Sequence, residues 1–315
     1  MAIVIQKIGG GSRVILLFGA SFCVLPNSLL GNENKKLRLL FCIPLTLHYL
    51  CNMISKNRLK SLRQLESKKH RYEMGLFVGE GPKVVGELLR YADADTVVCT
   101  STWASTHPNV SALEFYIVTD DELRRLSFLQ HPQQVFATFR LPCHDESVEE
   151  SAARISNQLC LALDGVQDPG NVGTIIRIAD WFGIDTIYCS TDTADAYNPK
   201  VVQATMGSIA RVSVIPTDLA SLIDHLPSST PVYGTVLDGD NVYDSVLGQR
   251  GLLVMGNEGN GLSTAIRSRL THRLLIPPYP ADNATAESLN VAIATAICCA
   301  EFRRCAPMRC GTQQP

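Results

Sequence analysis

Short apolar runs alternate with helical stretches through the second half of the chain. This alternation predicts a parallel β-sheet with helices on its faces, the α/β class. Ligands of such sheets bind beyond the carboxyl ends of the strands, so the loops that follow the apolar runs are where function is expected. The expected strands are Leu159–Leu163, Thr186–Cys189, Val212–Ile215, Val232–Val236, Leu252–Met255 and Leu274–Ile276.

Residues 53–150 carry a second, smaller α/β pattern. Pro82 suits the first position of a helix, and Asp120 or Asp121 suits the opening of another. The polar, acidic run 144–151 predicts the linker between this domain and a larger domain over residues 151–315. The strands expected in the smaller domain are the first half of Gly75–Leu89, then Thr96–Cys99, Phe115–Val118 and Val135–Phe139.

A basic segment opens the smaller domain, and three leucines at helical spacing within it predict an amphipathic helix. A charge run of this kind is usually a solvated helix face. Because the rest of residues 53–315 is acidic, contact with nucleic-acid phosphates is an equal alternative. The basic residues expected to make such contacts are Lys56, Arg58, Lys60, Lys68, Lys69 and Arg71.

Charge and composition restrict the chemistry. The net charge is −2, and because residues 1–52 hold five basic residues and one acidic residue, residues 53–315 carry −6. Bulk charge therefore does not attract nucleic acid, and a local patch is required. The eleven cysteines contain no CxxC pair, and the seven histidines are scattered. This usage fits a reducing cytosol and favours chemistry without a metal, with Cys298 and Cys299 as buried thiols.

Three strings follow strands of the larger domain. In Asp164–Ala179, two glycines permit a tight turn and Asn171 can cap the next helix, while Arg177 lies within two helical turns of it. An ordinary cap and a surface arginine are the alternative. The chain has no GxGxxG, so a nicotinamide dinucleotide site fails its main test.

The second string, Val254–Leu262, is rich in glycine, which lets the backbone approach a ligand. No Lys-Ser/Thr pair follows it, and Glu258 would repel phosphate, so it is not a P-loop. In the third string, Glu287–Ala294, Ser288 can cap a helix and Asn290 offers paired amide groups. Leu289 and Val291 are expected to face a cofactor or the core.

Taken in order, Asn171–Arg177, Gly256–Gly261 and Ser288–Val291 resemble the signature motifs of the SpoU/TrmH family of the SPOUT superfamily. The resemblance implies transfer of a methyl group from S-adenosylmethionine (AdoMet) to a ribose 2′-hydroxyl of RNA. It also implies a C-terminal trefoil knot and a homodimer with sites at its interface. Residues 53–150 resemble the ribosomal-protein-like substrate-binding domain of such enzymes, through Glu80-Gly-Pro-Lys.

The resemblance assigns roles to individual residues. The family account gives proton removal to the arginine that matches Arg177, but guanidinium groups are almost never deprotonated, so binding of the 3′-phosphate is preferred. The segment from Ile276 to Leu289 is longer than in many relatives. The implied catalytic residues are Arg177, Asn171, Glu258, Ser288 and Asn290, and the implied cofactor-binding residues are Gly256, Ile276, Leu289 and Thr235.

The substrate expected from the resemblance is 23S rRNA, with tRNA as the alternative. A non-enzymatic function, as an RNA-binding or ribosome-assembly factor on the same fold, is the competing hypothesis.

Residues 1–52 differ in composition from the rest of the chain, and Met53-Ile-Ser-Lys resembles the start of such an enzyme. We therefore expect residues 1–52 to be an upstream extension that is absent from the mature protein or disordered. We expect the protein itself to be cytoplasmic. A membrane anchor at 14–30 is the alternative, although Pro26 and Asn27 interrupt that run.

Overall fold

The computed structural model describes residues 2–8, 11–18, 21–24, 54–280 and 288–304. The chain divides into two units, Met1–Met53 and Ile54–Pro315. In the first unit the backbone forms an antiparallel sheet of β1 (Ala2–Ile8), β2 (Gly11–Phe18) and β3 (Ser21–Val24). Strands were not expected in the apolar run at 14–30, of which residues 14–18 and 21–24 are described. The apolar run at 39–50 lies outside the described residues.

The smaller domain of the second unit is built on a four-stranded mixed sheet in the order β4-β7-β5-β6. β7 runs antiparallel to β4 and β5, whereas β5 and β6 are parallel. The expected strands are confirmed, as are helix starts at Pro82 and Asp120. The elements are β4 (Leu76–Glu80), α4 (Pro82–Leu88), β5 (Ala94–Cys99), α5 (Ser101–Thr106), β6 (Ala112–Ile117), α6 (Asp120–Leu126) and β7 (Val135–Arg140).

The basic segment before β4 is not one helix. It consists of α2 (Lys56–Arg63), a 3-10 turn at Gln64–Glu66 and α3 (Lys68–Met74). Ser67 has extended backbone angles, φ −79° and ψ 131°, which end one helical stretch and begin the next. Leu62 and Leu65 are buried as the amphipathic pattern predicted, but the break changes the direction in which the basic side chains after Ser67 point.

The larger domain contains a six-stranded sheet in the order β10-β9-β8-β12-β11-β13, and every pairing is parallel. This confirms the predicted α/β class. The order reverses between β8 and β12, the point at which such sheets bind ligands. The strands are β8 (Leu159–Asp164), β9 (Thr186–Cys189), β10 (Ser213–Pro216), β11 (Val232–Asn241), β12 (Gly251–Gly256) and β13 (His272–Leu275).

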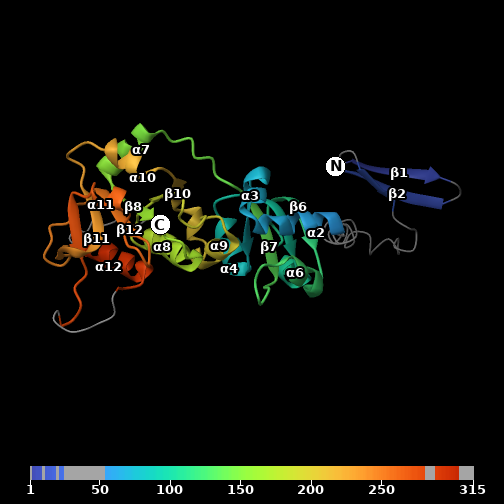
Figure 1. Ribbon diagram of the computed structural model, residues 1–315. Helices are drawn as coiled ribbons and strands as arrows, with labels where there is room; N and C mark the ends of the chain where they lie inside the picture. Colours follow the sequence, from blue (N-terminus) through green and yellow to red (C-terminus); the bar gives the residue numbers. More distant parts are fainter. Residues whose placement is uncertain (1, 9–10, 19–20, 25–53, 281–287, 305–315) are drawn as a thin grey trace. The chain divides into compact units, whose positions relative to one another are not determined.

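Helices cover both faces of this sheet because alternate strand residues point to opposite sides. Leu161 and Leu163 of β8 join the core on one face, and Cys160 and Ala162 join the core on the other. Figure 1 shows α8 and α12 on one side and α7, α10 and α11 on the other. The helices are α7 (Val148–Asn157), α8 (Pro169–Trp181), α9 (Pro199–Thr205), α10 (Leu219–Asp224), α11 (Thr264–Arg267) and α12 (Val291–Arg304).

The acidic run 144–151 is only partly a connection, because α7 begins at Val148. Ser147 and Glu150 form a capping box there, in which each side chain bonds the backbone N–H of the other. Cys298 and Cys299 are buried free thiols, as predicted. Among the described residues, no helix is both long and apolar enough to cross a membrane. The trefoil knot stays a prediction.

Candidate active site

The first signature loop connects β8 to α8 through a cap that the sequence placed incorrectly. Asp168, not Asn171, is the N-cap: its Oδ1 accepts a hydrogen bond from the Asn171 backbone N–H at 2.8 Å, and Pro169 follows at the first helical position. Both residue types cap well, and the extended backbone of Asp168 decides between them. The Asn171 side chain is therefore not used by its own helix.

The side chains of all three signature strings meet in one chain of hydrogen bonds. Asn171 Nδ2 donates to Glu258 Oε1 at 2.9 Å, and Asn290 Nδ2 donates to Asn171 Oδ1 at 2.9 Å. These residues are 87 and 119 positions apart in the sequence. The structure thus brings Asn171, Glu258 and Asn290, three of the five predicted catalytic residues, into direct contact at the carboxyl edge of the sheet.

Asn290 also begins α12, which corrects the predicted cap at Ser288. Its Oδ1 accepts hydrogen bonds from the backbone N–H groups of Ala292 at 3.0 Å and Ile293 at 3.3 Å. One amide group therefore caps the helix through its oxygen and reaches Asn171 through its nitrogen. Ser288 is exposed and outside this cap. Val291 was expected to face either a cofactor or the core, and it is buried in the core.

The second signature loop is organised by Asn257, which the sequence reasoning overlooked. Its Oδ1 accepts from the N–H groups of Gly259 at 2.9 Å and Asn260 at 3.0 Å, and its Nδ2 donates to the Gly165 carbonyl at 2.7 Å. This one amide shapes its own loop and ties it to the first. An Asn directly after an apolar strand was the available signal, because Asn side chains commonly bond backbone two residues on.

Gly256 is required by the loop itself, and its predicted contact with a cofactor stays a prediction. A Cβ added there would lie 2.4 Å from the Gly261 carbonyl carbon and 2.5 Å from the Leu262 nitrogen. The close approach is therefore between two parts of the same loop, whose Asn257 and Gly261 exchange backbone hydrogen bonds at 2.9 Å. Gly256 is buried and shapes the loop first; any contact with a cofactor passes through the loop that it permits.

Arg177 lies on the outer face of α8. Gly170, Thr174 and Trp181 share that exposed face at helical spacing, whereas Ile176 is fully buried. Among the described residues, Arg177 has no hydrogen bond or ion pair. An arginine without a protein partner keeps all five N–H donors of its guanidinium for a ligand.

The other predicted cofactor residues have different surroundings. Ile276 is half-buried against the core, Leu289 is 50% exposed, and Thr235 has a weak contact from its Oγ1 to Met255 Sδ at 3.9 Å. The seven residues 281–287 between Ile276 and Leu289 lie outside the described residues. Amide groups beside an exposed leucine give this edge both polar and apolar contacts, which an adenosyl group with an amino-acid tail requires.

The predicted RNA-binding residues divide into two groups. Lys56, Lys60, Lys68 and Lys69 are exposed. Arg58 binds within its own domain, with Nε 2.8 Å from Glu114 Oε2 and Nη2 2.8 Å from Thr96 Oγ1.

The prediction is wrong for Arg71, which is 1% exposed and paired with Asp195. Its position after the helix break turns the side chain inward.

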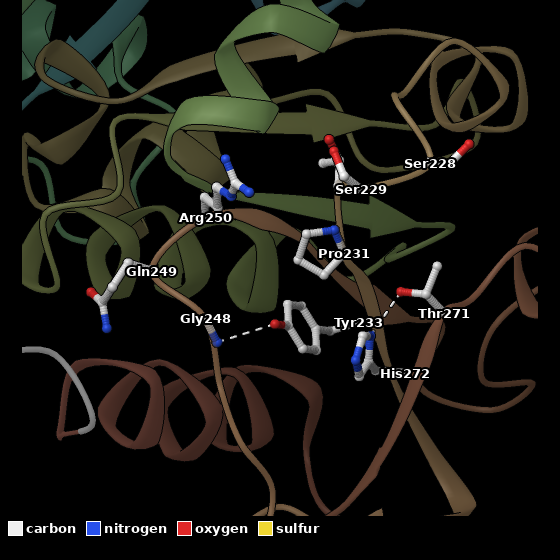
Figure 2. A pocket seen from close by; sticks show the side chains of 10 residues that line it. Ser228, Ser229, Pro231, Tyr233, Gly248, Gln249, Arg250, Thr271 and His272 are labelled. Carbon is white, nitrogen blue, oxygen red and sulfur yellow. Dashed lines mark hydrogen bonds between the residues drawn. The ribbon is translucent and has the colours of Figure 1, made fainter.

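A cavity of about 440 Å³ lies elsewhere, at the amino ends of β11, β12 and β13. Figure 2 shows Arg250, His272 and Tyr233 around it, with the Tyr233 hydroxyl accepting a hydrogen bond from the Gly248 N–H at 3.1 Å. This is the opposite edge of the sheet from the signature loops. The cavity is therefore separate from the candidate active site.

Comparison with known proteins identifies the family. The model of the SpoU rRNA methylase family matches residues 158–300, and that of the MRM3-like substrate-binding domain matches residues 56–137. The chain is 31% identical over 243 residues to the 23S rRNA (guanosine(2553)-2′-O)-methyltransferase RlmP of Bacillus subtilis, covering 76% of this chain and 93% of the relative. The chain belongs to the SpoU rRNA methylase family.

Solved structures give the same result over both domains. A TrmH-family protein from Porphyromonas gingivalis is 40% identical and superposes with a TM-score of 0.72, covering 81% of this chain and 100% of the other. The SpoU methyltransferase AviRb of Streptomyces viridochromogenes, solved in complex with AdoMet, is 26% identical with a TM-score of 0.69, covering 79% and 98%.

Proposed function

We propose that this protein transfers a methyl group from AdoMet to a ribose 2′-hydroxyl of RNA, and that the RNA is 23S rRNA. The observation that carries the proposal is the hydrogen-bonded chain Glu258–Asn171–Asn290, which joins the three signature loops at the carboxyl edge of the sheet. RlmP and further relatives are named as 2′-O-methyltransferases of 23S rRNA, which supports the choice of substrate.

AdoMet supplies a methyl group that its sulfonium already activates. The residues that would hold it are the backbone of the 256–261 loop, with Ile276, Leu289 and Thr235 beside it. A ribose hydroxyl is a poor nucleophile, so the protein must place the hydroxyl oxygen in line with the methyl group. Glu258, Asn171 and Asn290 fix the relative positions of the three loops for this purpose.

Arg177 is the residue that we assign to the RNA. A guanidinium keeps its charge and matches phosphate oxygens with two parallel N–H groups, whereas it is a very poor base. Binding of the 3′-phosphate next to the reacting ribose would orient the 2′-hydroxyl. The exposed position and the lack of a partner among the described residues support this role.

The exposed lysines Lys56, Lys60, Lys68 and Lys69 form the patch that we propose for the wider RNA contact. Such phosphate contacts position an RNA without reading its sequence. Because residues 53–315 carry a net charge of −6, this local patch must overcome the repulsion from the rest of the chain.

We also propose a homodimer, as the family resemblance implies. Trp181 of α8 is 85% exposed and Ile293 of α12 is 53% exposed, and apolar surface of this kind is a sign of an interaction site. Trp181 shares the outer face of α8 with Arg177, so a partner on this face would lie close to the reacting groups. A trefoil knot and a cytoplasmic location belong to the same proposal.

The proposal is tested with the purified chain, tritiated AdoMet and two unmodified transcripts, a 23S rRNA and a tRNA pool. We expect AdoMet binding by calorimetry and label in the 23S transcript. Label in tRNA alone would transfer the proposal to the alternative substrate. Absence of AdoMet binding at millimolar ligand would overturn the enzyme assignment and favour a non-catalytic RNA-binding factor.

A further inference from the structure

Arg71 is a buried charge that the proposed reaction does not use. Its Nη1 donates to the backbone carbonyls of Leu65 at 2.8 Å and Glu66 at 2.7 Å, which fixes the turn between α2 and α3. Its Nη2 donates to Asp195 Oδ2, which lies 124 residues away in the larger domain. The arginine thus connects the end of the lysine-rich segment to the catalytic domain.

Asp195 also has a buried side chain, and both of its carboxylate oxygens accept hydrogen bonds. Its side chain is 8% exposed, and its Oδ1 accepts hydrogen bonds from the Tyr72 hydroxyl and the Tyr197 backbone N–H, both at 3.2 Å. Burial and the neighbouring Asp195 carboxylate raise the pKa of Tyr72 to about 12, so the phenol stays protonated as a donor. Both oxygens of the carboxylate are therefore paired, as a buried carboxylate requires.

A second set of contacts joins the same two domains through Arg211. Its Nη1 lies 3.1 Å from Glu87 Oε2 at the end of α4, and its Nη2 lies 2.7 Å from Asp180 Oδ2 on α8. The guanidinium carbon also lies 5.4 Å from the centre of the Tyr91 ring. Asp180 is three residues from Arg177 on α8, so this contact holds the helix that carries the RNA-binding arginine.

The backbone and the core show that the domains are in close contact here. Gly207 has φ +98°, and a Cβ added to it would lie 2.4 Å from Glu87 Cβ. The Phe77 ring of β4 packs on the Tyr197 ring with centroids 5.1 Å apart. Phe77 and Tyr197 belong to one buried cluster that includes residues of both domains.

We propose that the Arg71–Asp195 pair locks the RNA-binding domain onto the catalytic domain in one orientation, and that Arg71 and Asp195 are positioning residues for methyl transfer. This proposal rests on the proposed function. Domains of one chain move relative to each other by default unless their interface is large and apolar. A locked domain fixes the distance from the lysine patch to Arg177, so that bound RNA presents one ribose to the site.

The test compares Arg71→Met and Asp195→Asn with Arg124→Met, a control that removes an exposed pair with Asp121 in the same domain. Hydrogen exchange measured by mass spectrometry reports docking through peptides 62–74 and 195–205. Single-turnover methylation of an unmodified 23S transcript at saturating RNA reports positioning. Calorimetry and a gel-shift assay report the dissociation constants for AdoMet and for the transcript.

We expect faster exchange in both peptides for the two test variants, and a single-turnover rate lowered about tenfold or more, because small misplacements of reactants are costly. Both dissociation constants should stay within about twofold, since neither ligand touches Arg71. The double variant Arg71→Met/Asp195→Leu should methylate faster than either single variant, because a well-packed apolar pair can replace a buried ion pair. A direct RNA contact by Arg71 would give no such rescue.

Two results would overturn the proposal. The first is unchanged exchange in both test variants, and the second is faster exchange with a wild-type rate of methylation. If Arg71→Met does not fold, Asp195→Asn keeps the side-chain volume and decides the question alone. If the wild-type protein methylates no RNA, the proposed function fails, and the exchange data still show whether the pair docks the domains.

Discussion

Arg177 and Arg71 were both expected to contact RNA, and the structure gives them opposite surroundings. Arg177 is exposed on α8 and has no partner among the described residues, whereas Arg71 is buried with two carbonyls and a carboxylate around it. A guanidinium that the protein leaves unpaired is available to a ligand, and one that the protein pairs is structural. The type of residue therefore says less about function than the partners it has in the fold.

The strongest test of this difference is substitution of Arg177, which has no partner among the residues that the structure describes. Arg177→Ala should lower the methylation rate by roughly 10²- to 10³-fold, the usual effect of removing a preorganised donor, with AdoMet affinity retained. Arg177→Lys should be intermediate because it keeps the charge and loses the paired N–H groups. Arg250→Ala, at the opposite edge of the sheet, is the matched control. Full activity of Arg177→Ala in a steady-state assay would refute the assignment.

Substitutions at Asn290 can distinguish its hydrogen bond to Asn171 from its role as the cap of α12. Asn290→Ala removes both, and should lower the free energy of unfolding by about 1 kcal/mol. Asn290→Ser keeps a capping oxygen but cannot reach Asn171. Both variants should lose about tenfold in methylation rate, because the loops are no longer held together.

Urea unfolding and single-turnover assays of the two proteins provide the comparison. If Asn290→Ser is close to wild type in both the methylation rate and the free energy of unfolding, the helix cap alone explains the effect of Asn290→Ala.

The structural role of Gly256 in its loop is tested by Gly256→Ala, which adds one methyl group. Gly256→Ala should destabilise the fold by about 1–3 kcal/mol, because the added carbon meets the backbone of Gly261 and Leu262. Gly259→Ala is the control in the same loop, where the nearest atom would lie 3.6 Å away, an ordinary contact. Thermal denaturation without AdoMet distinguishes the explanations: a glycine needed only for the cofactor would leave the apo protein unchanged.

The smallest expected effect concerns pH and the ion pair between Arg211 and Asp180, which both lie in the larger domain. The Arg211 guanidinium lowers the pKa of Asp180. A lowered pKa means that the ion pair stabilises the fold at neutral pH, and that this contribution is lost as pH falls below about 4 and through the folded-state pKa. Asp180→Asn should therefore be less stable than wild type at pH 7, with the difference closing toward pH 2. Urea unfolding measures the free energy of unfolding of both proteins over this pH range. A difference between them that does not change with pH would contradict the ion pair.

The sequence predicted the sheet well because its strands are local apolar runs. Both ends of the strand Thr186–Cys189 were predicted correctly. The loops after β8 and β12 were predicted as the candidate site, and the structure brings their side chains together. The caps were misplaced because Asp168 and Asn171, or Ser288 and Asn290, cap almost equally well by residue type. The burial of Arg71 could not be predicted, since it depends on a partner 124 residues away and on a helix break at Ser67.

Residues 1–52 stay a separate prediction. Mass spectrometry of the native protein should show no peptides from residues 1–40 if translation starts at Met53. Intact peptides from that region would refute the upstream extension, and membrane fractionation would then test the anchor.

The most direct test of the central claim is the chemical identity of the product. An unmodified 23S rRNA transcript is incubated with AdoMet and either the wild-type protein or Arg177→Ala, digested to nucleosides and measured by mass spectrometry. We predict one 2′-O-methylated nucleoside with wild-type protein, and its near absence with Arg177→Ala. A methyl group on a base, or equal ribose methylation by both proteins, would contradict the proposed reaction and the role of Arg177.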